Sequence, residues 1–285
     1  MKSVVKKILA ATLCLTFAVG LVACSGDQAA KGKGGKEAIK IGTFPSTTQL
    51  PNILKDSLAD EYDVEIVLFD GNNMPAEALN AKELDGIIGN GDKWLATYNK
   101  ENNTNLVMVD KLYSHFSGLY SEKYKSTEEF PDGAKIAIAN DPTNVNNALK
   151  LLQNSGLIDL SEKPGSGNVY TTLDITKNDK NLKFMQMDLT MIAKNMKDVD
   201  GVVTSAILIK EAGGDPMSFL ALPNQEDLQK DGLIVNADDQ YKGWVKKAVE
   251  VGHTEENKKK LMEELEGTAF LLEDADAFFA KNKAE

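Results

Sequence analysis

The first side chain with recognisable chemistry is Cys24. It follows a basic start, an apolar run over residues 8–22 and the small residue Ala23. This order is typical of a secretory signal peptide whose cleavage site carries a cysteine, and the apolar run is too short to span a bilayer. The alternative is an ordinary cleaved leader in which the cysteine is accidental. We predict that residues 1–23 are a signal peptide and that the Cys24 thiol is lipidated with a diacylglycerol.

Side chains that catalyse reactions are otherwise scarce. The sequence has two histidines, His115 and His253, and two cysteines, Cys14 and Cys24, and it contains no HExxH, GxSxG or P-loop pattern. Because Cys14 lies inside the predicted leader, the mature chain is left without a disulfide or a cysteine metal cluster. We therefore expect no catalytic residue, no metal site and no cofactor, and we predict that the protein is not an enzyme.

Two loops carry side chains suited to binding. Residues 140–144 read Asn, Asp, Pro, Thr, Asn between a predicted strand and a predicted helix, whose free backbone amides can hold an anionic group. Residues 89–92 read Gly, Asn, Gly, Asp after another strand, with Trp94 as an apolar wall. The plainer alternatives are a helix cap for Asn144 and a tight turn around Asn90 and Gly91.

Charge restricts the partners. The formal net charge of the 285 residues is −11, and loss of Lys2, Lys6 and Lys7 with the leader changes it to −14. All basic residues other than histidine are lysines, because the sequence contains no arginine. Phosphate backbones require clustered positive charge, so we expect no nucleic-acid partner.

The elements that must position these loops alternate between strand and helix, which favours parallel sheets covered by helices. Residues 24–37 are predicted to form a lipidated N-terminus and a flexible linker. The twelve linker residues 25–36 have an expected end-to-end distance of roughly 20 Å. The expected strands include residues 64–69, 86–89, 135–139, 182–187 and 201–203, and the expected helices include residues 51–62, 75–84, 93–100, 143–154, 243–251 and 255–265. A body of this size is expected to form two lobes with the binding loops at the strand ends.

Residues 111–160 resemble the NlpA/MetQ lipoproteins, the methionine-binding, lipid-anchored receptors of ABC importers. The resemblance rests on Gly-Leu-Tyr-Ser at 118–121, Pro-Asp-Gly-Ala at 131–134, Asn-Asp-Pro-Thr-Asn at 140–144, Glu-Leu-Asp at 83–85, Asn-Leu-Lys-Phe at 181–184, Asp-Val-Asp at 198–200 and Glu-Ala-Gly at 211–213. It covers nearly all of the mature chain.

This resemblance implies an α/β, two-lobed periplasmic-binding-protein fold of type II-like organisation, with the ligand cleft between the lobes. We place lobe 1 at residues 38–117 plus 230–285 and lobe 2 at residues 118–229. The implied partners are a small-molecule ligand, a membrane permease and its ATPase. We expect a monomer, lipid-anchored to the cell membrane and facing outside the cytoplasm. The alternative is a surface lipoprotein of the same fold that has lost transport and serves in interaction or adhesion.

The family's ligand-binding positions differ in this chain. Asn147 stands where the family has a carboxylate-binding arginine, and Ser205 and Ile207 stand where it has two asparagines. Loss of the arginine alone is expected to weaken a methionine-like ligand at least about tenfold, unless Lys93 replaces its charge. The resemblance aligns Gly91 with a histidine, and Tyr113 and His115 with a histidine and a glutamate. The candidate ligand-binding residues are Asn90, Gly91, Trp94, Tyr113, His115, Asn144, Asn147, Ser205 and Ile207.

Overall fold

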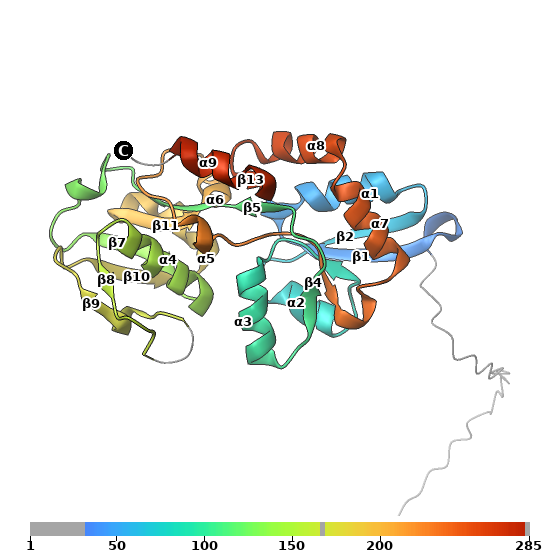
Figure 1. Ribbon diagram of the computed structural model, residues 1–285, viewed down its shortest axis with the longest axis horizontal. Helices are drawn as coiled ribbons and strands as arrows, with labels where there is room; N and C mark the ends of the chain where they lie inside the picture. Colours follow the sequence, from blue (N-terminus) through green and yellow to red (C-terminus); the bar gives the residue numbers. More distant parts are fainter. Residues whose placement is uncertain (1–31, 166–168, 283–285) are drawn as a thin grey trace, which may run out of the picture.

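A computed structural model describes residues 32–165 and 169–282. The predicted signal peptide, the Cys24 lipidation site and the linker up to residue 31 lie outside the described residues. Figure 1 shows two groups of strands and helices side by side, with α8 and α9 along one edge of the molecule. Within the described residues, no helix combines the length and the apolar character that crossing a bilayer requires.

The first sheet has the strand order β2-β1-β3-β12-β4. Its strands are β1 (Glu37–Thr43), β2 (Tyr62–Leu68), β3 (Gly86–Ile87), β4 (Leu106–Met108) and β12 (Ile234–Asn236). β1 is parallel to β2 and β3, whereas β12 is antiparallel to β3 and β4. The helices of this half are α1 (Gln49–Leu58), α2 (Met74–Asn80), α3 (Asp92–Asn102), α7 (Gly243–Gly252) and α8 (Glu255–Leu265).

The spacing of apolar residues explains how these helices pack. α1 buries Leu50, Ile53, Leu54 and Leu58, which recur at the three- and four-residue steps of one helical face. They join a core cluster with Ile39 and Ile41 of β1 and with Trp244 of α7. The predicted helix over residues 255–265 is confirmed, and its start is fixed by Thr254, whose hydroxyl accepts the amide of Asn257 at 3.3 Å.

The second sheet has the strand order β10-β7-β11-β6. Its strands are β6 (Ser117–Tyr120), β7 (Lys135–Ala139), β10 (Lys183–Met187) and β11 (Gly201–Ser205). The nearby helices and the small hairpin are α4 (Pro142–Asn154), α5 (Leu189–Ile192), α6 (Ala206–Glu211), β8 (Asp159–Leu160) and β9 (Ile175–Lys177). α4 ends just before Gly156, whose φ of +73° suits a helix C-terminus.

Two passages of the described chain run between the sheets. The outward passage runs through β5 (Tyr113–His115) into β6, and β5 pairs with β13 (Ala269–Leu271). The return passage runs from the short turn Gln225–Asp227 to β12, and a bridge between Tyr113 and Asp231 holds the two passages side by side. α9 (Ala275–Asn282) completes the chain, and its Phe279 packs in one cluster with Phe116 and Ala206.

The structure corrects two expectations. Both sheets are mixed rather than parallel. β6 follows the outward passage and is antiparallel to β11 in the second sheet, and β12 follows the return passage and is antiparallel to β3 in the first sheet. The end of the predicted linker is bound to the body: the Lys33 amide donates to the Asp63 carboxylate at 2.7 Å, the Lys36 ammonium donates to the Ala59 carbonyl, and Glu37 begins β1. The lobe bounds 38–117 plus 230–285 and 118–229 stay a prediction.

Candidate functional site

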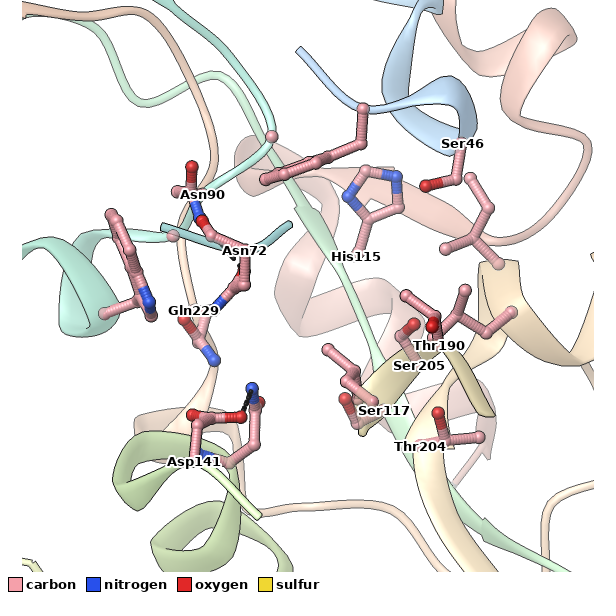
Figure 2. A pocket seen from close by; sticks show the side chains of 18 of the residues that line it. Ser46, Asn72, Asn90, His115, Ser117, Asp141, Thr190, Thr204, Ser205 and Gln229 are labelled. Atoms are coloured by element: carbon pink, nitrogen blue, oxygen red, sulfur yellow. Dashed lines mark hydrogen bonds between the residues drawn. The ribbon is translucent and has the colours of Figure 1, made fainter. Parts of the chain in front are cut away.

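A cavity of about 710 Å³ lies between the two sheets. This volume falls within the range of about 300–1,000 Å³ that small-molecule sites occupy. The lining includes Phe44, Asn90 and Asp141, which follow the carboxyl ends of β1, β3 and β7, and Ser205, which ends β11. Ligands of open α/β sheets bind at such strand ends, so the fold explains why residues distant in sequence meet here. Figure 2 shows the side chains of Asn90, Asp141 and Ser205 around an open space.

Asn90 supplies a buried amide on the side of the first sheet. Its side chain is only 3% exposed, and its Nδ2 donates weakly to the carbonyl oxygen and the Oδ1 of Asn72, at 3.4 and 3.3 Å. Its Oδ1 has no hydrogen-bond partner among the described residues. A buried polar atom without a partner costs free energy, and sites that bind polar ligands are one place where such atoms occur.

The two glycines beside Asn90 permit close packing within the protein. Gly89 has a φ of +116°, and a Cβ atom there would lie 2.6 Å from the hydroxyl of Thr47. A Cβ atom at Gly91 would lie 2.4 Å from Oε1 of Gln229, which also lines the cavity. Trp94 stacks on Tyr98 with ring centroids 4.9 Å apart and gives the cavity an apolar wall. Glycine at positions 89 and 91 therefore leaves room for the Thr47 and Gln229 side chains.

His115 and Asp231 form a buried pair where the two passages meet. Asp231 is 5% exposed, and its Oδ2 accepts the His115 amide at 3.1 Å and lies 3.4 Å from the ring Nδ1. A carboxylate at this place favours a proton on Nδ1, which leaves Nε2 of the neutral ring as an acceptor. Nε2 is buried and has no partner among the described residues.

The second sheet contributes the start of α4 and the end of β11. The Asp141 carboxylate caps α4, because Oδ1 accepts the Asn144 amide at 3.0 Å and Oδ2 accepts the Asn144 side-chain Nδ2 at 2.8 Å. This carboxylate already takes an N-terminal amide that could otherwise hold an anionic ligand. Asn147 lies one turn further along, and its Oδ1 accepts from Nδ2 of Asn146 at 3.3 Å.

Thr204 is the third cavity residue with a buried, unpartnered atom. It is 2% exposed, and its hydroxyl oxygen finds no hydrogen-bond partner in the described part of the chain. Its neighbours Ser205 and Ile207 also line the cavity.

Lys93, which could have replaced the missing arginine, is not part of the lining. Its Nζ donates to the Glu226 carbonyl at 2.9 Å and lies 4.0 Å from Asp227. Burial lowers the pKa of Lys93, and the nearby Asp227 carboxylate partly offsets this effect. Asp227 is also paired with Lys150 of α4. Lys93 therefore serves a charge cluster at the cavity edge that joins α3 and α4 through the return passage.

The structure brings most of the predicted residues together. The cavity is lined by Asn90, Gly91, Trp94, His115, Asn144, Asn147, Ser205 and Ile207. Tyr113 does not line it: the side chain is 1% exposed, lies in the core of the first sheet and meets the His115 ring edge-on with centroids 5.1 Å apart. Burial, with a smaller contribution from the Asp231 charge, raises the pKa of Tyr113 well above its ordinary value. The binding roles of these residues stay a prediction.

Several lining residues were not predicted from the sequence. Asn72 belongs to a Gly-Asn-Asn turn just after β2, which is a signal that could have found it. Thr204 could have been found from its position beside Ser205. Gln229 and Asp231 lie on the return passage and reach the cavity only through the fold, which also places Asp231 against His115. Within residues 32–165 and 169–282, no three His, Cys, Asp or Glu side chains are grouped so that they could hold a metal ion.

Comparison with known proteins gives a consistent result. A family model described as NlpA lipoprotein matches residues 39–271. The D-methionine-binding lipoprotein MetQ of Salmonella typhimurium is 30% identical over 238 residues, which are 82% of this chain and 85% of the relative. Lipoprotein 28 of Escherichia coli is 34% identical over 185 residues, which are 63% of this chain and 67% of the relative.

Solved structures agree in fold. A nutrient binding protein from Burkholderia cenocepacia bound to methionine superimposes with a TM-score of 0.77 at 30% identity, covering 82% of this chain and 99% of that one. The substrate binding protein of a methionine transporter from Streptococcus pneumoniae gives a TM-score of 0.76 at 27% identity, covering 82% of this chain and 95% of that one.

Proposed function

This chain belongs to the NlpA lipoprotein family, and from this premise we propose that it is the lipid-anchored substrate-binding protein of an ABC importer. Its α/β fold, predicted from the sequence, is that of the nutrient binding protein and the transporter substrate-binding protein with which it superimposes. The observation that carries the proposal is the cavity between the sheets, which takes its lining from both sheets and from both passages. A solute held there contacts both halves, so binding favours the arrangement in which they close on it.

The connections between the sheets suit such a movement. The two passages run between the sheets, and they are held together where Tyr113 bridges Asp231. Asp227 of the return passage lies between Lys150 on α4 and Lys93 on α3. Rotation about the passages changes the distance between α3 and α4, so closure of the two halves changes the ion pairs that Asp227 makes with Lys93 and Lys150.

The names of the relatives make methionine the reference solute for this chain. Apolar side chains such as Phe44, Phe69 and Trp94 line the cavity and suit the apolar part of a small molecule. The polar positions differ from the family pattern, with Asn147 in place of the arginine. We therefore propose a small organic solute and treat methionine as the first compound to test.

The anchor and the transporter complete the proposal. Cys24 carries the lipid, the segment after it joins the body at Gly32, and the protein stays at the outer face of the cell membrane. From there the loaded protein, a monomer, delivers its solute to a membrane permease driven by a partner ATPase. Presence at the membrane keeps the receptor close to the permease at a high effective concentration.

The test begins with the solute that the protein itself captures. The chain without its first 24 residues is purified natively, denatured to release bound molecules, and the extract is analysed by mass spectrometry. We expect one small solute at high occupancy, and addition of that solute to stripped protein should reduce the radius of gyration measured by small-angle X-ray scattering.

A pair of serine variants controls this experiment. Ser46 lines the cavity, whereas Ser126 is a similarly half-buried serine outside it. Ser46→Trp should fill part of the cavity and abolish co-purification of the solute, and Ser126→Trp should retain it. An empty cavity in the native protein, with no closure across a panel of metabolites, would favour a surface interaction protein and refute the transport role.

A further inference from the structure

The charges that line the cavity are strongly unbalanced. Lys194 is the one lysine of the lining within the described residues, and the sequence contains no arginine. Against it stand six carboxylates, those of Asp70, Asp141, Asp188, Glu211, Asp227 and Asp231. A ligand carboxylate brought into this cavity would meet like charges, and burying it without a positive partner is costly.

The lysines near the cavity are either paired or exposed. Lys150 is bound to the Asp227 carboxylate. The exposed Lys194 lies near Glu211 and lowers the pKa of that carboxyl, against the larger raising effect of burial. The start of α4 donates the Asn144 amide to Asp141 rather than to the cavity. No buried positive group among the described lining residues is therefore free to receive a ligand carboxylate.

The buried polar atoms point to the opposite kind of group. Asn90 Oδ1 is an acceptor by its chemistry, and His115 Nε2 becomes one when Asp231 holds the ring proton on Nδ1. Both atoms are without a partner in the described residues, and both residues border the upper half of the open space in Figure 2. The Thr204 hydroxyl, on the opposite side, can accept as well. A donor of several N–H bonds with a positive charge fits both the acceptors and the surplus of carboxylates.

We infer that the solute of this cavity carries a protonated amine and no free carboxylate, with an apolar body that packs on the aromatic wall. This inference rests on the proposed function and specifies its substrate class. An ammonium group offers three N–H donors, and its charge is attracted by Asp231 through His115 and by the carboxylates of the cavity rim.

Four probes with the same thioether body separate the head groups. They are L-methionine, L-methioninamide, 3-(methylthio)propylamine and 3-(methylthio)propanoate. Each is titrated by isothermal calorimetry into the stripped chain, at a pH at which the amines are protonated. We expect the amide and the propylamine to bind at least about tenfold more tightly than methionine, the effect of one charged hydrogen bond, and the propanoate not to bind. Methionine binding as tightly as methioninamide, or binding of the propanoate, would overturn the inference.

A charge introduced at Asn147 provides the second test. Asn147→Arg places a guanidinium in the cavity lining, and Asn154→Arg makes the same change at the exposed far end of α4. We expect Asn147→Arg to shift the ratio of methionine to propylamine affinity toward methionine by about tenfold or more, and Asn154→Arg to leave it unchanged. Equal ratios in both folded variants would contradict the charge argument. If Asn147→Arg does not fold, the four probes with the unmodified chain decide.

The outcomes also separate this inference from the proposed function. A co-purified solute or probe with a free carboxylate as the preferred ligand leaves the transport role intact and refutes only the amine. A co-purified amine supports both, even where its body differs from the probes. Binding of none of the four probes, together with no released solute, refutes the proposed function and this inference with it.

Discussion

Thr204→Val is expected to stabilise the ligand-free protein, although a buried threonine is replaced. The side chain is 2% exposed in β11, and its hydroxyl has no hydrogen-bond partner among the described residues. Valine keeps the branched shape that strands favour and removes the polar atom. The perturbation therefore deletes an unfavourable burial rather than a bond.

The magnitude follows from the cost of that burial. An unsatisfied buried polar group costs about 1–3 kcal/mol, and we take the lower end because the hydroxyl can rotate toward distant acceptors. A gain of about 1 kcal/mol in the free energy of unfolding raises the melting temperature of a protein of this size by roughly 2–4 °C. If the hydroxyl binds the solute, its loss should also weaken affinity by about two- to tenfold.

Thr268 provides the matched control. It is 0% exposed, and its hydroxyl donates to the Leu265 carbonyl at 2.7 Å. Thr268→Val removes that bond, so the melting temperature should fall by roughly the same 2–4 °C. Thermal melts followed by circular dichroism, on protein stripped of bound solute, measure both variants. A fall for Thr204→Val that matches the fall for Thr268→Val would refute the reasoning.

Three further perturbations test other parts of the site and the fold. Asp227→Asn removes the carboxylate that pairs with Lys150 and should lower the free energy of unfolding in urea by about 1.5–3 kcal/mol. Asp179→Asn, in an exposed ion pair, should leave the urea midpoint unchanged. Equal losses of stability in the two variants would contradict the role of the buried cluster. Gly91→Ala places a Cβ atom 2.8 Å from Cβ of Gln229 and should lower the melting temperature and change solute affinity, whereas Gly243→Ala, with 3.3 Å to its nearest neighbour, should do neither. A hydrogen bond from the backbone amide of Lys135, and to a smaller extent the ammonium of Lys123, lowers the pKa of Asp200 against the effect of burial. The ionised carboxylate therefore stabilises the fold above its unfolded pKa of about 3.9, and this stabilisation is lost as the pH falls through the lower folded pKa. Melting temperature against pH should therefore fall less steeply below about pH 4 for Asp200→Asn, and parallel curves for both proteins would show that the pKa of Asp200 is not shifted.

The local sequence was sufficient to predict elements whose apolar residues recur with a clear helical spacing. The helix over residues 255–265 has an apolar face at Leu261 and Leu265 and a threonine cap, and it was predicted with the observed bounds. By contrast, β5, β6, β13 and α9 were not predicted. The three strands have three or four residues each, and each is defined by a partner far away in the chain, as in the pairing of Phe270 with Ser114. A short segment without a period carries no local signal for such pairing.

The candidate site was predictable where strand ends meet. Asn90, Asn144 and Ser205 lie at the carboxyl ends of strands or in the loops that follow, and the alternation of strands and helices brings those ends together. Tyr113 and His115 lie two residues apart on β5, so both side chains are on the same face of the strand and the sequence pattern does not distinguish them. Only packing separates them, because the core of the first sheet covers Tyr113 and leaves His115 at the cavity.

Residue composition and the N-terminal pattern settle two points before any folding is considered. An acidic chain without arginine has no bidentate carboxylate partner in any fold, and Cys24 after an apolar leader predicts an anchor whatever the body does. Tertiary structure alone decided which charges meet: Asp231 lies beside His115, 116 residues away, and Asp227 pairs with Lys150, 77 residues away. The reason is that residue types are a property of the chain, whereas burial and pairing depend on closing long loops, which only the packed core makes favourable.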